Sequence, residues 1–115
     1  MVEAQKLTAF ATLPLIKELN GVLNRSKFKF IIKSRGLKVE DYVIKYLSLV
    51  KIVPYISSIK LEENETPSDI KDSFVIKSAI SARVDALITG DLDILALKHV
   101  RGISILSPTD FLLSL

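Results

Sequence analysis

The sequence lacks cysteine and contains a single histidine. Without thiolates, the chain has neither a disulfide framework nor a zinc site of the zinc-finger type. Glycine is also scarce, and the four glycines are scattered, so no glycine-rich loop is available to cradle a phosphate. The chain therefore excludes thiolate chemistry, and nothing in it supports a nucleotide-binding loop.

Long hydrophobic runs are missing as well. The longest apolar runs are too short to span a bilayer, and residues 1–6 do not resemble a secretory signal. The length of 115 residues suits one domain covering 1–115, and a hydrophobic content of 49% with 25% charged residues is typical of a globular protein. We therefore expect a soluble cytoplasmic protein that does not contact the membrane.

Acidic residues are absent between Glu18 and Glu40, although the net charge is only +3. Six basic residues fill this gap: Arg25, Lys27, Lys29, Lys33, Arg35 and Lys38. Such a patch could bind the phosphate backbone of RNA, or it could be a solvated face of the protein. Phe28 and Phe30 lie among these basic residues, and we expect both rings to be buried in the core. We predict that the basic stretch binds RNA.

The hydrophobic pattern predicts helices alternating with short strands. Amphipathic helices are expected over 15–23, 39–50 and 69–83, and Thr12 is expected to be the N-cap of the first. A short helix over 94–98 and a last helix that begins at Pro108 are expected to follow. Strands are expected over 6–11, 86–88 and 103–106, and residues 51–56 are expected to form a strand or an extended segment. This alternation predicts an α/β fold, a three-layer sandwich with a short parallel sheet flanked by helices.

Two carboxylates follow the expected strand 86–88 directly. Thr89-Gly90 ends the strand, and Asp91 and Asp93 stand where the next helix begins. In open α/β sheets, ligands bind outside the carboxyl ends of the strands, and carboxylates placed there can hold a divalent cation such as Mg²⁺. The alternative is that Asp91 caps the helix and Asp93 favours its dipole. From this segment alone both interpretations remain open.

The stretches 15–28, 89–95 and 102–112 resemble PIN domains, a metal-dependent ribonuclease fold common among toxins of prokaryotic toxin–antitoxin systems. The resemblance implies that Glu18, Asp72, Asp91 and Asp93 are the catalytic acids and hold Mg²⁺ or Mn²⁺. The metal would activate water and offset charge on the scissile phosphate of single-stranded RNA. We therefore expect the four acids to converge in one pocket, and at least one of them to have a raised pKa. The resemblance further implies an antitoxin protein as a partner.

The resemblance does not extend to the first elements of the family's chain. The family's chain opens with a strand that ends in an aspartate and then a helix, and nothing in this sequence corresponds to either. We therefore expect a shortened domain with weak metal binding and self-association as a homodimer, because a sheet without its middle strand exposes unpaired backbone groups. The alternatives are a non-catalytic PIN-like module that binds RNA or protein and, with less support, a phosphoacceptor domain that uses Asp91. We expect His99 to be structural or at the surface.

Overall fold

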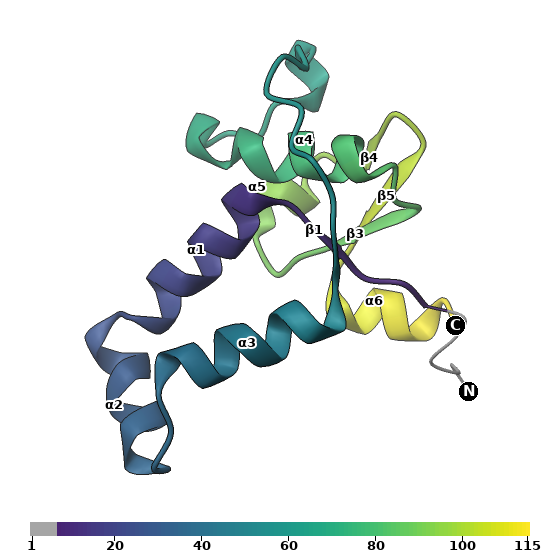
Figure 1. Ribbon diagram of the computed structural model, residues 1–115. Coiled ribbons are helices and arrows are strands. Elements are labelled where there is room, and N and C mark those ends of the chain that lie inside the picture. Colours follow the sequence, from purple (N-terminus) through teal and green to yellow (C-terminus); the bar gives the residue numbers. More distant parts are fainter. Residues whose placement is uncertain (1–6) are drawn as a thin grey trace.

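The computed structural model describes residues 7–115, and its elements follow one another along the chain as shown in Figure 1. The α-helices are α1 (Leu13–Leu23), α2 (Ser26–Ser34), α3 (Val39–Leu49), α4 (Ser73–Ala82), α5 (Leu92–Leu95) and α6 (Pro108–Leu113). The strands are β1 (Phe10–Ala11), β2 (Lys51–Ile52), β3 (Ala86–Ile88), β4 (His99–Val100) and β5 (Ile103–Leu106). Two short 3-10 helices, η2 (Glu63–Glu65) and η3 (Ile70–Asp72), lie between β2 and α4. The α/β fold class is confirmed.

The strands form two small sheets instead of one. The strands β1 and β2 pair in parallel, and a separate sheet has the order β3-β5-β4. In the second sheet β3 and β5 are parallel, whereas β4 and β5 are antiparallel. Two details of the expected sheet are therefore wrong. The described strands do not join into a continuous sheet, and β4 adds an antiparallel edge because a two-residue turn connects it to β5.

Most element boundaries agree with the hydrophobic pattern, and β3 and β5 agree to the residue. The expected helix over 69–83 is interrupted, since Asp69 accepts a hydrogen bond from the Lys71 backbone N–H and begins η3 before α4 starts. His99 is exposed, as expected. The helix α2 was not predicted, because its alternating lysines and phenylalanines give no helical periodicity. The expected strand over 6–11 is confirmed only at β1, and Lys6 lies outside the described residues.

The main core lies between α4, α5 and the three-stranded sheet. Ile76 on α4 packs with Ile94, Val100 and Ile105, and all four side chains are buried. Partly buried apolar side chains surround this cluster, among them those of Leu61, Val75, Ile80, Leu87, Leu95 and Leu97. Because α4 and β3 both contribute to this core, the residues at the start of α4 and at the end of β3 are held in a fixed relation.

A buried hydrogen bond links the first sheet to α4. Thr12 directly follows β1, and its hydroxyl lies 2.6 Å from the Ser78 hydroxyl on α4. The exposed fractions of these residues are 0% for Thr12 and 2% for Ser78. Thr12 is the N-cap residue of α1, as predicted, but its side chain makes no capping hydrogen bond. The hydroxyl instead ties the β1–α1 unit to the helix that follows Asp72.

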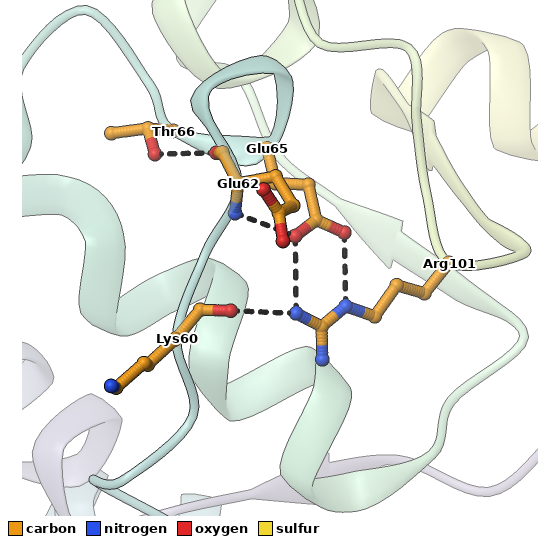
Figure 2. A network of polar contacts seen from close by, with 5 residues as sticks. All are labelled: Lys60, Glu62, Glu65, Thr66 and Arg101. Atoms are coloured by element: carbon orange, nitrogen blue, oxygen red, sulfur yellow. Dashed lines mark hydrogen bonds and ion pairs between the residues drawn. The ribbon is translucent and has the colours of Figure 1, made fainter.

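A polar network holds the long segment between β2 and α4 against the β4–β5 turn (Figure 2). Arg101 donates hydrogen bonds to both carboxylate oxygens of Glu65, at 2.9 and 3.1 Å, and to the backbone carbonyl of Lys60, at 2.8 Å. Glu65 also accepts a hydrogen bond from the Glu62 backbone N–H at 2.9 Å. Arg101 has φ of 50° and Gly102 has φ of 81°, the pattern of a two-residue hairpin turn. Left-handed backbone is unfavourable for arginine, and its hydrogen bonds to the long segment offset that strain.

The helices α2 and α3 extend away from the three-stranded sheet as a helical arm (Figure 1). Both helices contact α1, and few of their side chains are buried. None of the helices within residues 7–115 is long and apolar enough to cross a membrane.

Candidate functional site

Asp91 is fixed at the carboxyl end of β3 by two local hydrogen bonds. Its backbone N–H donates to the Thr89 hydroxyl at 3.1 Å, and its Oδ1 accepts from the Asp93 backbone N–H at 2.9 Å. Asp91 is thus the N-cap of α5, so the capping interpretation is confirmed. Capping occupies only one of the two carboxylate oxygens, which leaves Oδ2 of Asp91 free for a second role.

Asp72 occupies the corresponding position at the start of α4. It ends η3 and is the N-cap residue of α4, but its side chain makes no capping hydrogen bond. The carboxyl is partly buried, and the charge of Asp91 acts on it. The structure therefore brings together two predicted site residues that lie nineteen positions apart in the sequence.

Burial raises the pKa of Asp72 above its ordinary value, and neighbouring carboxylates add to this effect. The charges of Asp69, Asp91 and Asp93 all disfavour ionisation of Asp72. The expectation that at least one acid would have a raised pKa is confirmed for Asp72. A partly desolvated carboxyl with like charges around it is common at functional sites, because a proton or a cation is needed to offset the repulsion.

Sequence reasoning missed Asp69 as a member of this group. Asp69 is exposed. Its charge is the second largest cause of the raised pKa of Asp72, and the burial of Asp72 itself is the largest. Its side chain caps η3 by accepting from the Lys71 backbone N–H at 3.1 Å. The spacing of three residues between Asp69 and Asp72, at the start of a helical segment, was the signal in the sequence, since residues at i and i+3 lie on one helix face.

The four predicted acids do not all converge. Glu18 lies exposed on α1 and is not among the charges that raise the pKa of Asp72, whereas Asp93 is exposed but acts on Asp72. Within residues 7–115, no group of three or more acidic or histidine side chains has a geometry that could hold a metal ion. The carboxylate site that the structure shows therefore consists of Asp72 and Asp91, with Asp69 and Asp93 nearby.

The donor set of this site suits a hard divalent cation. Carboxylate oxygens are the ligands that Mg²⁺ prefers, and protein sites for Mg²⁺ commonly supply only one or two carboxylates, while water and substrate phosphates complete the octahedron. Asp72 and Asp91 provide such a pair, and a cation bound there would relieve the repulsion between their charges. The residues present therefore fit Mg²⁺ or Mn²⁺ as a two-carboxylate site.

The predicted RNA-binding residues lie on and around α2. All six are exposed: Arg25, Lys27, Lys29, Lys33, Arg35 and Lys38. Phe28 and Phe30 are exposed too, Phe30 at 75%, so the expectation that both rings are buried in the core is wrong. The Lys27 Nζ lies 5.7 Å from the centre of the Phe28 ring. The helix places cations and aromatic rings together in solvent, because α2 is in the helical arm and meets little of the core (Figure 1).

The family model of the PIN domain matches residues 1–93. The chain belongs to the PIN domain family. The match includes Glu18, Asp72, Asp91 and Asp93, and it ends at Asp93 within α5, before the β4–β5 hairpin. No curated protein and no solved structure shows a significant match to the chain.

PIN domains are generally nucleases and typically use divalent metals, so the chain carries a nuclease-like domain. The resemblance that the sequence predicted is confirmed for the family. The roles of the individual acids and of the basic helix remain predictions at this point.

Proposed function

We propose that this PIN domain is a divalent-metal-dependent endoribonuclease that cleaves single-stranded RNA at the Asp72–Asp91 site. The observation that carries the proposal is that Asp72 and Asp91 lie close enough for their charges to interact, with burial and like charges raising the pKa of Asp72. The site also lies at the carboxyl end of β3, where α/β folds place their ligands. Neither residue needs a histidine or a cysteine to assist it.

Each acid has a distinct task in this proposal. Asp91 is rigid because its Oδ1 caps α5, so its Oδ2 and the Asp72 carboxylate would hold Mg²⁺ or Mn²⁺ between them. Asp69 and Asp93 add negative charge close to the pair and so favour a cation over a proton. A bound cation at such a site supplies electrostatic stabilisation for the charge that develops on the scissile phosphate. Glu18 is proposed as the outlying acid of the site, on α1.

The helix α2 is proposed as the main contact to the RNA backbone. Its lysines and the flanking arginines are exposed, and the absence of acids between Glu18 and Glu40 leaves the patch uniformly basic. The exposed rings of Phe28 and Phe30 add surfaces on which unpaired bases can stack. Single-stranded RNA offers both phosphates and free bases to such a patch, whereas the bases of a duplex are stacked inside it.

The test is cleavage of a fluorescent single-stranded RNA with Mn²⁺, by the natural chain and by two matched variants. Asp91→Asn should abolish cleavage and leave the melting temperature nearly unchanged, because asparagine caps helices as well as aspartate does. Asp85→Asn serves as the control, since Asp85 is exposed at the opposite end of β3. Cleavage that survives in Asp91→Asn, or that is lost equally in Asp85→Asn, would contradict the proposal.

A non-catalytic module that binds RNA or protein is the second candidate function. One observation favours it: Glu18 stands apart from the other acids, and residues 7–115 hold no group of three possible ligands. This candidate predicts RNA binding through α2 with no cleavage at any Mn²⁺ concentration. The same assay therefore separates the two functions.

We also propose that the chain associates with a second copy. Its accessible surface is 8340 Å², whereas a compact monomer of 12.8 kDa exposes about 6300 Å². The surplus of about 2000 Å² per chain exceeds the roughly 800 Å² that each partner buries in a standard protein interface, so the chain has surface to spare for one. On α3, Ile44 is 65% exposed beside the half-buried Tyr42 and Tyr46, which makes this helix a candidate contact surface. A toxin-like role with an antitoxin protein as a second kind of partner is part of the proposal.

A further inference from the structure

A hollow of about 590 Å³ opens at the carboxyl ends of β1 and β2, and its lining includes neither Asp72 nor Asp91. It is lined by Leu13, Pro14 and Lys17, which follow β1, and by residues 52–55 at the end of β2. The two strands are parallel, with Ala11 opposite Ile52, so the residues that follow them emerge at the same edge. This volume lies within the range of small-molecule sites, which α/β folds build at this edge.

The hollow combines flat apolar surfaces with a single charge. Tyr55 is half-buried, Pro14 and Pro54 flank the hollow, and Lys17 is the one ionisable cation in the lining, which contains no acid. Proline loses no side-chain freedom when a ligand binds, so these walls are already ordered. The chemistry therefore suits a ligand with a flat, largely apolar face and a negative charge beside it.

The segment that carries Tyr55 is held on both sides. The Val53 backbone N–H donates to the Ala11 carbonyl at 2.9 Å, and the Ile56 backbone N–H donates to the Ser81 hydroxyl at 2.9 Å. Tyr55 thus lies between two anchored residues, although the segment around it has no regular secondary structure. A preorganised aromatic ring costs little entropy on binding.

We propose that this hollow is a nucleobase subsite for single-stranded RNA, with Tyr55 as the stacking surface and Lys17 as the contact to an adjacent phosphate. The inference rests on the proposed function, because it names a subsite for the same substrate. The helix α1 connects the parts: Lys17 precedes Glu18 on it, and α1 ends just before Arg25, where the basic stretch begins. A single strand seated in the hollow can therefore follow α1 toward α2 (Figure 1).

Binding of a fluorescent 12-nucleotide RNA, measured in EDTA so that no cleavage occurs, tests this subsite. Tyr55→Ala should weaken binding roughly 5- to 150-fold, since this is the loss found when one base–aromatic stack is removed. Tyr55→Phe should bind like the natural chain, because the ring remains. Leu112→Ala, on the exposed side of α6, is the control for a general loss of apolar surface and should bind normally.

The salt dependence separates the two proposed contacts. Lys17→Gln should reduce the slope of log affinity against log salt by about 0.7, the value for one phosphate contact, whereas Tyr55→Ala should leave the slope unchanged. Uridine 5′-monophosphate should shift the NMR signals of the Leu13 and Ile52 methyl groups in the natural chain, which requires no variant to fold. An unshifted spectrum, or normal affinity in Tyr55→Ala, would overturn the subsite.

Two further outcomes keep this inference distinct from the proposed function. If Tyr55→Ala turns a dimer into a monomer with unchanged RNA affinity per chain, the hollow is a self-association surface and the subsite is refuted. If the chain binds RNA through Tyr55 but never cleaves it with Mn²⁺, the subsite stands and the nuclease proposal fails.

Discussion

The buried hydroxyl pair of Thr12 and Ser78 allows a quantitative test of how the β1–α1 unit is attached to α4. Both groups are almost fully buried, and each is the other's partner at 2.6 Å. Removing one hydroxyl strands the other in an apolar site, which costs about 1–3 kcal/mol. For a domain of this size, each kcal/mol lowers the melting temperature by about 4 °C, so a single replacement should lower it by roughly 4–12 °C.

The two single replacements should differ. In Thr12→Val the stranded Ser78 hydroxyl can turn to the backbone carbonyl four residues earlier on α4, as Ser81 already does to Lys77 at 2.7 Å. In Ser78→Ala the stranded Thr12 hydroxyl can accept a capping N–H from α1, but capping uses only its oxygen and leaves the O–H proton unpaired. Ser78→Ala should therefore be the more destabilising variant.

Thermal unfolding would measure the coupling between the two hydroxyls, with both single variants and the double variant compared. Thr109→Val, at an exposed residue of α6, is the control. The double variant should lose clearly less stability than the sum of the singles, because it leaves no stranded hydroxyl. Losses that simply add would refute the reasoning, since they would show that the two hydroxyls do not depend on each other.

Four further predictions follow from the charges and the surface. Asp72→Asn should raise the melting temperature at pH 7 and leave it unchanged near pH 3. The pKa of Asp72 is higher in the folded than in the unfolded state, so its ionisation destabilises the fold as the pH rises from the unfolded-state pKa through the folded-state pKa. A series of melting curves at different pH values checks the sign. Arg101→Ala should lower the melting temperature at pH 7, because the hydrogen bond from Arg101 lowers the folded-state pKa of Glu65. The variant should also lose less stability than the natural chain as the pH falls below the usual glutamate pKa. A variant whose stability is as sensitive to acid as that of the natural chain would contradict this. Replacing Lys27, Lys29 and Lys33 by glutamine should flatten the salt slope of RNA binding by about 2, at 0.7 per contact, and an unchanged slope would show a merely solvated face. Sedimentation should show dimers, and a stable monomer at high concentration would refute self-association.

The sequence predicted those parts of the fold in which local pattern and packing agree. The strands β3 and β5 coincide with short apolar stretches and the helix α3 has strong apolar periodicity, and all three were assigned nearly to the residue. The helix α2 was missed because its face toward the protein buries only Ile32, so burial left no periodic pattern to read. The separation into two sheets depends on long-range pairing between strands of two to four residues, which no local pattern specifies.

The candidate site was predicted in part for a similar reason. Asp91 stands at a strand end and Asp72 at a helix start, and both positions follow from local sequence. Their approach to each other comes from the packing of α4 against the sheet through Ile76, which the sequence does not encode locally. Glu18 was assigned through the family resemblance alone, and its exposed place on α1 depends on how the β1–α1 unit sits against α4.

Paramagnetic broadening by Mn²⁺ in an amide NMR spectrum tests the central claim most directly, because it locates the cation without relying on catalysis. The account predicts that substoichiometric Mn²⁺ selectively broadens the amide signals of residues 69–73 and 89–93, and that Asp91→Asn abolishes this effect. Broadening centred on the acidic residues 62–65, or no selective broadening at all, would contradict a metal site at Asp72 and Asp91.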